Sequence, residues 1–197
     1  MNEKFRNRYR IPSNRLRGWD YAGNGHYFIT IVTHNRIPFF GNVVNGEIIL
    51  NEMGKMVYNE FFKSFETRKE LFLGEFILMP NHLHAIVILD KSNCTMCDGT
   101  PQTYYPCGCV NVGLAPQFRR KPKSISSFVA GFKSATINHI DDWIDVNNSA
   151  IRKFNRNNPL WQANYYDHII RNETEYRKIS TYITENPLNW DVDVLKR

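Results

Sequence analysis

Apolar positions along the chain form runs and alternations that predict the four strands of one sheet. Residues 26–33 are aromatic and β-branched, which is typical of a strand. Residues 75–79 and 83–89 predict a hairpin, because the turn dipeptide Pro80-Asn81 separates two apolar runs. A later aromatic run predicts a last strand over residues 165–170.

Apolar residues spaced by three and four predict three helices. Residues 51–69 carry a stripe of methionine and phenylalanine, and Asn51 is placed to cap the first turn. Residues 124–144 keep the same spacing past an internal glycine and predict a second helix. A third helix begins after Asn172 and ends before Pro187, because proline disfavours helical geometry in the preceding residue.

The order of these elements predicts an α+β fold. Strand, helix, strand, strand, helix, strand is the ferredoxin-like or RRM-like split βαβ arrangement, an antiparallel sheet with both helices packed on one face. The third helix follows as a C-terminal addition. Between the first strand and the first helix, Asn45-Gly46 predicts a tight type I′ hairpin over residues 43–50.

Two histidines follow the turn of the predicted 75–89 hairpin. Side chains alternate along a strand, so His82 and His84 share one face while Leu83 and Ala85 point to the other. Two imidazoles on one face of a rigid strand can bind one metal ion, although the pair alone does not choose the metal. The alternative is that the two histidines lie on a solvated face of the sheet.

Composition limits the class of protein. The 197 residues, of which 42% are hydrophobic, suit one globular domain with its own core. We see no apolar run long enough to span a bilayer and no signal peptide, so we expect a cytoplasmic protein without a membrane partner. We expect a basic N-terminal extension at 1–20 and a single domain at 21–197, with a cysteine-containing insertion at about 91–122.

The net charge of +6 is unevenly distributed. Arginine and lysine concentrate in the N-terminal tail and in a second cluster near residue 120, a pattern that favours binding of a phosphate backbone. The alternative for the tail is a flexible solubilising segment. The predicted nucleic-acid contacts are Arg6, Arg8, Arg10, Arg15, Arg17, Arg119, Arg120, Lys121 and Lys123.

The cysteines form two close pairs inside the insertion. They are Cys94, Cys97, Cys107 and Cys109. Disulfides are disfavoured in the cytoplasm, and four thiolates in two pairs can bind a structural Zn²⁺ ion. The C-x-C spacing of the second pair fits the usual zinc pattern less well, so free thiols in a loop remain the alternative.

The third predicted helix adds a candidate nucleophile. Tyr182 and Asn186 are four residues apart and therefore share one face of that helix. A tyrosine beside an amide oxygen, together with two histidines elsewhere, indicates a combined nucleophile and metal site.

Three segments, in their order, resemble the REP-associated tyrosine transposases. The segments are MPNHLHAIVIL at 79–89, SISSFVAGFKSA at 124–135 and LWQANYYDHIIRNETEYRKISTYITENPLNW at 160–190. These transposases belong to the single-tyrosine HUH transposase superfamily, in which U is a hydrophobic residue. The resemblance covers about residues 20–190, and the ordered set is more specific than any one motif.

The resemblance implies that His82 and His84 bind Mg²⁺ or Mn²⁺ and that Asn186 supplies a third ligand. It also implies that Tyr182 is the nucleophile. Two imidazoles and one amide oxygen leave coordination positions open for phosphate oxygens, so the chemistry agrees.

Other tyrosines compete for the role of nucleophile. We expect Tyr165 and Tyr166 to pack or to stack on bases, because no ligand-type residue lies one helical turn away. Tyr176 lies too early on the last helix to share a face with Asn186.

The implied function is that of a transposase-like endonuclease and strand transferase. It would act on single-stranded, hairpin-forming DNA through a 5′-phosphotyrosine intermediate, as a monomer or a homodimer. The alternative is a non-catalytic RNA- or DNA-binding domain on an RRM-like scaffold, which would carry aromatic residues on its central strands. This chain has His-Leu-His there, which favours the enzyme.

Overall fold

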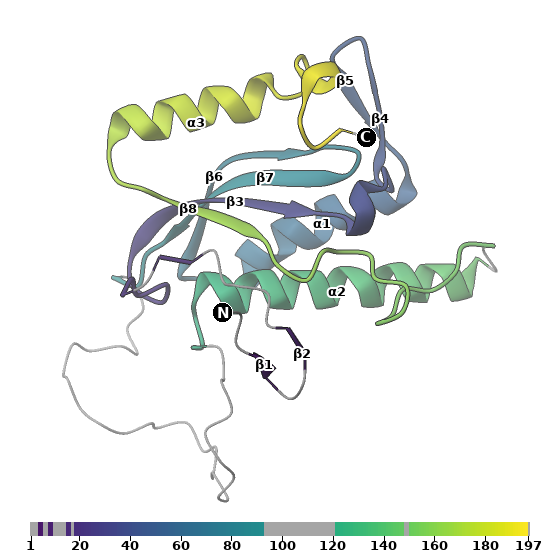
Figure 1. Cartoon of the computed structure of the whole chain (residues 1–197), viewed down its shortest axis with the longest axis horizontal. Coiled ribbons are helices and arrows are strands. Elements are labelled where there is room, and N and C mark those ends of the chain that lie inside the picture. Colours follow the sequence, from purple (N-terminus) through teal and green to yellow (C-terminus); the bar gives the residue numbers. More distant parts are fainter. Residues whose placement is uncertain are drawn as a thin grey trace, which may run out of the picture.

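The computed structural model describes residues 4–5, 8–9, 15–16, 18–92, 121–147 and 150–196 (Figure 1). The four cysteines lie outside these residues, so the zinc site stays a prediction. Two short N-terminal strands, β1 (Lys4–Phe5) and β2 (Arg8–Tyr9), pair antiparallel. Among the described helices, none is long and apolar enough to cross a membrane.

A four-stranded antiparallel sheet in the order β6-β7-β3-β8 forms the centre of the molecule. The strands are β3 (Gly25–Val32), β6 (Leu71–Leu78), β7 (His82–Leu89) and β8 (Tyr166–Ile170). Helix α1 (Glu52–Thr67) connects β3 to β6, and α2 (Ile125–Val146) connects β7 to β8. Each connection skips one strand position, so the predicted α+β fold with a ferredoxin-like split βαβ topology is confirmed.

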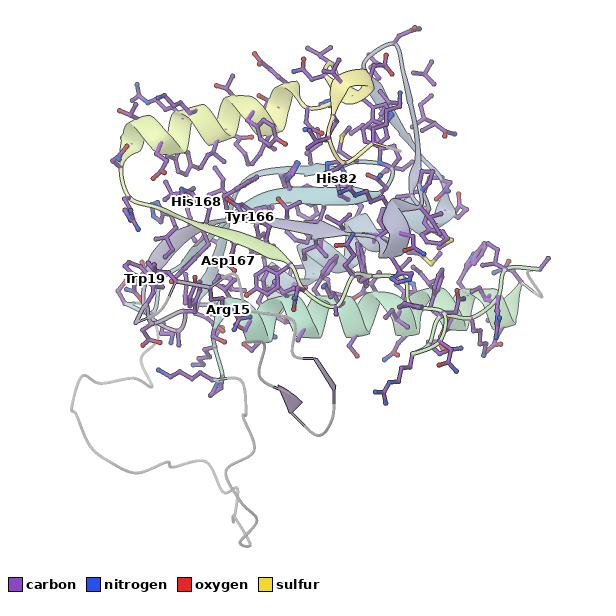
Figure 2. All side chains as sticks on the ribbon, in the orientation of Figure 1. Arg15, Trp19, His82, Tyr166, Asp167 and His168 are labelled. Carbon is purple, nitrogen blue, oxygen red and sulfur yellow. The ribbon has the colours of Figure 1, made fainter. Side chains whose placement is uncertain are left out.

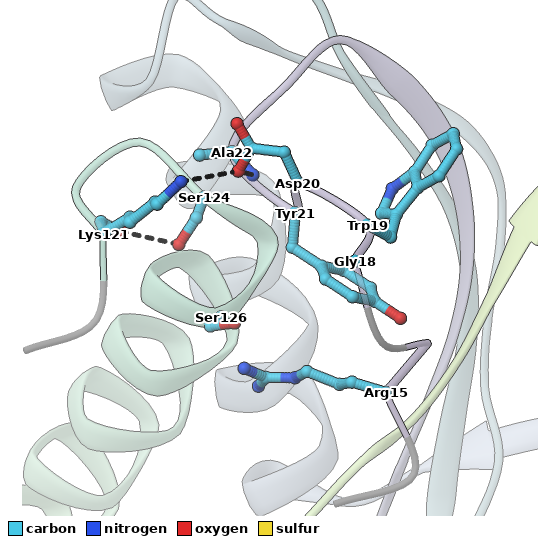
Figure 3. A pocket seen from close by; sticks show the side chains of 9 residues that line it. All are labelled: Arg15, Gly18, Trp19, Asp20, Tyr21, Ala22, Lys121, Ser124 and Ser126. Carbon is cyan, nitrogen blue, oxygen red and sulfur yellow. Dashed lines mark hydrogen bonds and ion pairs between the residues drawn. The ribbon is translucent and has the colours of Figure 1, made fainter. Parts of the chain in front are cut away.

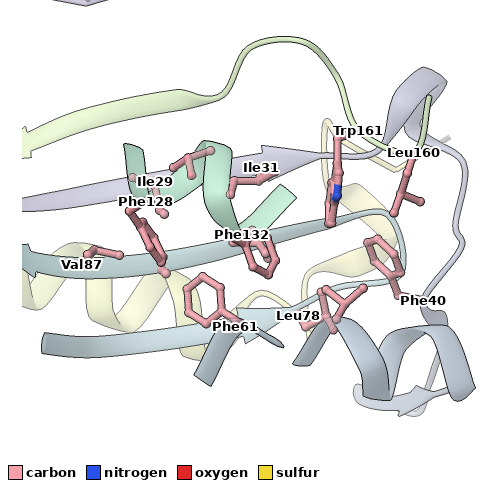
Figure 4. Close-up of a cluster of buried hydrophobic side chains, with 14 of the residues drawn as sticks. Ile29, Ile31, Phe40, Phe61, Leu78, Val87, Phe128, Phe132, Leu160 and Trp161 are labelled. Atoms are coloured by element: carbon pink, nitrogen blue, oxygen red, sulfur yellow. The ribbon is translucent and has the colours of Figure 1, made fainter. Parts of the chain in front are cut away.

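Helices α1 and α2 cover one face of the sheet, where most of the hydrophobic core lies (Figure 4). The Phe61 ring of α1 stacks on Phe76 with a centroid distance of 4.4 Å and contacts Phe132 of α2 at 5.3 Å. Burying a side chain of this size contributes about 1.5–3 kcal/mol. Fully buried strand residues on this face include Tyr27, Ile29, Ile31, Leu83, Ala85 and Val87.

Helix α3 (Glu173–Glu185) lies on the opposite face of the sheet (Figure 1). Its apolar contact is smaller and centres on Ile86, Ile170 and Ile183. The start of the helix is held by polar contacts, because Asn172 caps the first turn and His168 Nε2 lies 2.6 Å from Glu175 Oε1. The two faces of the sheet therefore differ, and the α3 face is the one that carries polar residues.

The short hairpin before α1 has the predicted geometry. Strands β4 (Gly41–Val44) and β5 (Glu47–Leu50) pair antiparallel. Asn45 and Gly46 both have positive φ, at 53° and 77°, as a type I′ turn requires. Asn51 then caps α1, because its Oδ1 accepts a hydrogen bond from the backbone N–H of Gly54 at 2.9 Å.

Strand β6 begins at Leu71, four residues earlier than the sequence predicts. The pairing with β7 shifts register between Leu73 and Phe76, so Gly74 and Glu75 interrupt the apolar alternation that would have revealed the strand. A Cβ at Gly74 would lie 2.7 Å from the Tyr176 hydroxyl, so glycine here lets α3 approach the sheet. Strand β8 begins one residue later than predicted.

Candidate metal and nucleophile site

His82 and His84 lie at the start of β7, on the sheet face that carries α3, and Figure 2 labels His82 there. In the register with β3, His82 pairs with Val32 and His84 with Thr30. The two imidazoles share one face as predicted, but they are 0% and 2% exposed. The alternative of histidines on a solvated face is therefore wrong.

Hydrogen bonds at Nδ1 orient the His82 ring. The Asn81 amide nitrogen donates to the carbonyls of Arg36 and Leu195 at 3.0 and 2.8 Å, which leaves its Oδ1 as the acceptor 2.7 Å from His82 Nδ1. His82 Nδ1 must then carry the proton, and Nε2 keeps its lone pair. Such a partner at the second ring nitrogen is usual for histidines that bind metals.

His84 is oriented in the same way. Its Nδ1 lies 2.8 Å from Thr30 Oγ1, and its Nε2 lies 3.2 Å from the Tyr182 hydroxyl. If the phenol donates to Nε2, the proton of the ring is on Nδ1 and is donated to Thr30. Both histidines then direct an unprotonated Nε2 into the candidate metal site.

The carboxylate of Asp193 lies close to both histidines. Its Oδ2 lies 3.7 Å from His82 Nε2, and one ligand atom from each of the three residues lies within 4.8 Å of the others. Asn186, at the C-cap of α3, is only 3% exposed. This set of nitrogen and oxygen donors could hold a divalent metal ion.

Several buried atoms of the site lack a hydrogen-bond partner among the described residues. They are His82 Nε2, Asn186 Oδ1 and Asp193 Oδ2. Buried polar atoms normally have partners, because an unsatisfied one costs about 1–3 kcal/mol. A cation would satisfy all three atoms at once, so the residues fit a bound metal.

The protonation states of the two histidines suit metal binding. Burial lowers the pKa of His82 to about 4, although the charge of Asp193 and the Asn186 side chain act in the opposite direction. Burial and the neighbouring His82 lower the pKa of His84 well below its ordinary value. Both rings are therefore neutral at pH 7, the form that coordinates metals.

Tyr182 places its hydroxyl against the candidate ligand His84, although the residue is 46% exposed. Burial raises the pKa of the Tyr182 phenol, and the charge of Asp193 raises it further, whereas Asn186 lowers it. The phenol is therefore protonated at neutral pH in the absence of a cation.

The competing tyrosines lie elsewhere. The Tyr165 hydroxyl contacts Arg15 at 3.1 Å and Ser126 of α2 at 3.4 Å, on the other side of the sheet. Tyr166 is half exposed on β8, and Tyr176 packs against the small apolar cluster under α3. Of these four tyrosines, Tyr182 alone has a described contact between its hydroxyl and a candidate ligand.

Sequence reasoning missed Asp193. The short helix η2 (Trp190–Val192) turns the chain back over β7 after α3, and the backbone carbonyls of Val194 and Leu195 accept hydrogen bonds from Arg36 and Asn81. The position of Asp193 therefore depends on long-range contacts of the C-terminal segment. An acidic residue in a short polar tail carries no spacing signal that could have revealed this.

The basic residues predicted to bind nucleic acid are described only in part. Arg15 and Lys121 line a cavity of about 410 Å³ together with Trp19 and Tyr21 (Figure 3). Lys121 Nζ lies 3.0 Å from Asp20 Oδ1, and Lys123 sits just before the cap of α2. Outside the described residues lie Arg6, Arg10, Arg17, Arg119 and Arg120, and for Arg8 only the backbone is described.

Comparison with solved structures identifies the class of fold. The chain is similar to a REP-associated tyrosine transposase bound to a REP hairpin, with a TM-score of 0.53 and 18% identity, over 91% of this chain and 74% of the other. At this identity the similarity shows the shared fold.

Sequence comparison identifies the family. The chain belongs to the same family as a Haemophilus influenzae protein described as uncharacterized, with 31% identity over 183 residues, which are 93% of this chain and 91% of the relative. No family model matches the chain.

Proposed function

We propose that the chain is a transposase-like, metal-dependent endonuclease and strand transferase for single-stranded DNA, with Tyr182 as its nucleophile. The observation that carries this proposal is the 3.2 Å contact between the Tyr182 hydroxyl and His84 Nε2, beside three buried polar atoms without partners. A nucleophile in contact with a metal-type donor set is an arrangement that suits metal-assisted phosphoryl transfer.

In this proposal His82, His84 and Asp193 bind Mg²⁺ or Mn²⁺, and Asn186 offers a further oxygen. The carboxylate and amide oxygens suit both ions, and the imidazoles favour Mn²⁺ over Mg²⁺. These donors leave coordination positions for phosphate oxygens. When bound, the cation would polarise the scissile phosphate and offset the charge that develops on it.

Tyr182 carries out the covalent step of the proposed reaction. Its oxygen attacks the phosphorus, a new P–O bond forms to the tyrosine, and the bond from phosphorus to the 3′ oxygen breaks. The phenol loses one proton and the departing 3′ oxygen gains one, so the products are a 5′-phosphotyrosine and a free 3′-OH. Attack by another 3′-OH reverses the step and joins strands without ATP, because the phosphodiester energy is kept in the covalent link.

The exposure of the site fits such a substrate. The ligand candidates are buried, whereas Tyr182 is 46% exposed, so the site borders the solvent at this residue. The opposing pKa effects at Tyr182 indicate that the protein alone does not ionise the phenol. Deprotonation would therefore depend on the bound cation and substrate.

Hairpin-forming DNA is the substrate that we propose. The fold is shared with a transposase whose structure contains a REP hairpin. The basic extension at 1–20 and the cluster near residue 120 supply positive charge for the phosphate backbone. We propose that residues 21–197 form the catalytic domain, which acts as a monomer or a homodimer.

A non-catalytic RRM-like binding module is less well supported. Such modules bind bases on an open sheet, whereas α3 covers β6 and β7 here. The central strand β7 also directs two buried histidines toward this face in place of exposed aromatic residues.

The test is formation of a covalent adduct. Wild type incubated with labelled hairpin-forming single-stranded DNA and Mn²⁺ should yield a protein–DNA product that survives denaturation, and Tyr182→Phe should yield none. The substitution removes one oxygen and keeps the ring, so folding should be unaffected. An adduct that persists in Tyr182→Phe and maps to another tyrosine would refute the assignment.

A further inference from the structure

We propose that Tyr166 is a stacking platform for the base of the nucleotide next to the scissile phosphate. This inference rests on the proposed function, since it assigns a substrate subsite beside the same catalytic centre. It makes β8 the strand along which the single-stranded DNA leaves the metal site.

The sheet register places Tyr166 in line with the candidate metal ligands. Thr30 on β3 pairs with His84 on one side and with Tyr166 on the other. Directly paired residues point to the same face, so these three side chains form one row across three strands. Adjacent strands are about 4.8 Å apart, which puts the Tyr166 backbone about 10 Å from that of His84, within reach of one nucleotide.

An aromatic contact supports the Tyr166 ring and links it to the nucleophile. Phe28 lies edge-on to Tyr166 with a centroid distance of 6.2 Å, and the same ring contacts His84 at 5.3 Å and Tyr182 at 6.1 Å. Tyr166 nevertheless remains 50% exposed. A supported, half-exposed aromatic ring loses little entropy when a base stacks on it.

Further residues of β8 beyond Tyr166 could contact the DNA. A cavity of about 280 Å³ follows the outer edge of this strand, where Tyr166, His168 and Arg171 line it together with Asp167 and Tyr21. Tyr166 and His168 are two residues apart and share a face of β8, opposite to Asp167 (Figure 2). Within the described sheet β8 pairs only with β3, so no described strand covers its outer edge. Arg171, at the end of the strand, supplies positive charge for a following phosphate.

Helix α3 packs mainly over the other half of the sheet and leaves Tyr166 half exposed. The helix starts directly after β8 but packs over β6 and β7 (Figure 1). His168, through its 2.6 Å contact with Glu175, holds the start of α3 at the end of β8. The base platform on β8 and the nucleophile on α3 are therefore linked through Phe28, whose ring contacts both.

Binding measurements test the platform independently of cleavage. On a Tyr182→Phe background, we compare Tyr166→Ala, Tyr166→Phe and Tyr58→Ala for affinity to a hairpin oligonucleotide that spans the mapped cleavage site. Tyr166→Ala should weaken binding roughly 5- to 150-fold, the range of one lost base–aromatic stack. Tyr166→Phe should restore binding, since stacking needs only the ring. Tyr58 is 41% exposed on α1, on the other face of the sheet, and serves as the matched control.

A fluorescent base locates the stacked nucleotide. Placed at successive positions around the cleavage site, 2-aminopurine should be quenched by the protein next to the scissile phosphate, and Tyr166→Ala should abolish this quenching at that position only. Equal affinity and unchanged quenching in Tyr166→Ala, with adducts still formed by wild type, would overturn the platform alone. Absence of adducts in wild type would overturn the proposed function and, with it, the assignment of this subsite to cleavage.

Discussion

The hydroxyl of Tyr182 lies 3.2 Å from Nε2 of His84, the nitrogen that a bound metal ion would use. In the proposed function, the Tyr182 hydroxyl and the metal therefore compete for one lone pair. Metal binding must break this hydrogen bond, and the hydroxyl is then free to face the phosphate. Without metal, this contact would hold Tyr182 close to the position that the proposed reaction needs, with the phenol protonated.

We predict that Tyr182→Phe binds Mn²⁺ at least as tightly as wild type. Removing the hydroxyl frees His84 Nε2, and a hydrogen bond of about 0.5–1.5 kcal/mol corresponds to roughly two- to tenfold tighter binding. Calorimetry in the absence of DNA measures this effect. Clearly weaker binding by the variant would mean that the phenol oxygen is itself a ligand.

His82→Ala and His84→Ala should each abolish Mn²⁺-dependent cleavage and leave DNA affinity within a few-fold of wild type. In the proposed function, DNA affinity rests mainly on contacts between basic residues and phosphates, which these substitutions do not touch. His139→Ala is a matched control, because this histidine is 46% exposed and lies on α2, away from the site. Full cleavage by the His82→Ala/His84→Ala double variant would exclude the pair as metal ligands.

Asp193→Asn should reduce Mn²⁺ affinity at least roughly tenfold, since it removes the only carboxylate of the described ligand group. Without metal the same variant should be more stable than wild type, by on the order of 1 kcal/mol, because a buried, unpartnered carboxylate oxygen is replaced by a neutral amide. Metal titration and urea unfolding measure the two opposite effects.

Asp191→Asn is the control for that experiment. Asp191 lies two residues away, but its carboxylate is 90% exposed and pairs with Lys196. It should change neither metal affinity nor stability appreciably. If both variants behaved alike, the effect would come from the charge of the C-terminal segment and not from coordination by Asp193.

Asp167→Asn should stabilise the protein at neutral pH and have little effect at pH 3. Burial raises the pKa of the Asp167 carboxyl above its ordinary value, although Tyr21 and Arg15 act in the opposite direction. A carboxyl with a raised pKa destabilises the folded state once pH rises above the unfolded pKa, and this cost is absent when the group is protonated in both states. Urea unfolding midpoints of both proteins between pH 3 and 8 check this, and a difference that stays constant with pH would contradict it.

Sequence patterns predicted most of the helices and strands, because interactions between neighbouring residues determine most of them. Asn45-Gly46 and the cap at Asn51 depend on a few neighbouring residues, and the structure has both as predicted. The predicted start of β6 was wrong, because Gly74 and Glu75 interrupt the alternation of apolar residues where the strand bulges. That glycine is needed for the approach of Tyr176, a contact distant in sequence.

The candidate site could be predicted only where a single element builds it. The strand period placed His82 and His84 on one face, and the helix period placed Tyr182 and Asn186 within one turn. Their burial could not be predicted, because it depends on how α3 and the C-terminal segment lie over the sheet. Asp193 was missed for the same reason, since long-range contacts of Val194 and Leu195 fix its position.

The unequal faces of the sheet have an evolutionary consequence. Along β7, Leu83, Ala85 and Val87 serve the core under α1 and α2, while His82 and His84 carry unsatisfied or competing polar atoms on the reverse side. A lineage released from selection for the proposed catalysis would gain stability by replacing the polar side chains with apolar ones, without disturbing the core side. Decaying copies of this gene should therefore lose the histidines and Asp193 early, while every second residue of β7 remains apolar.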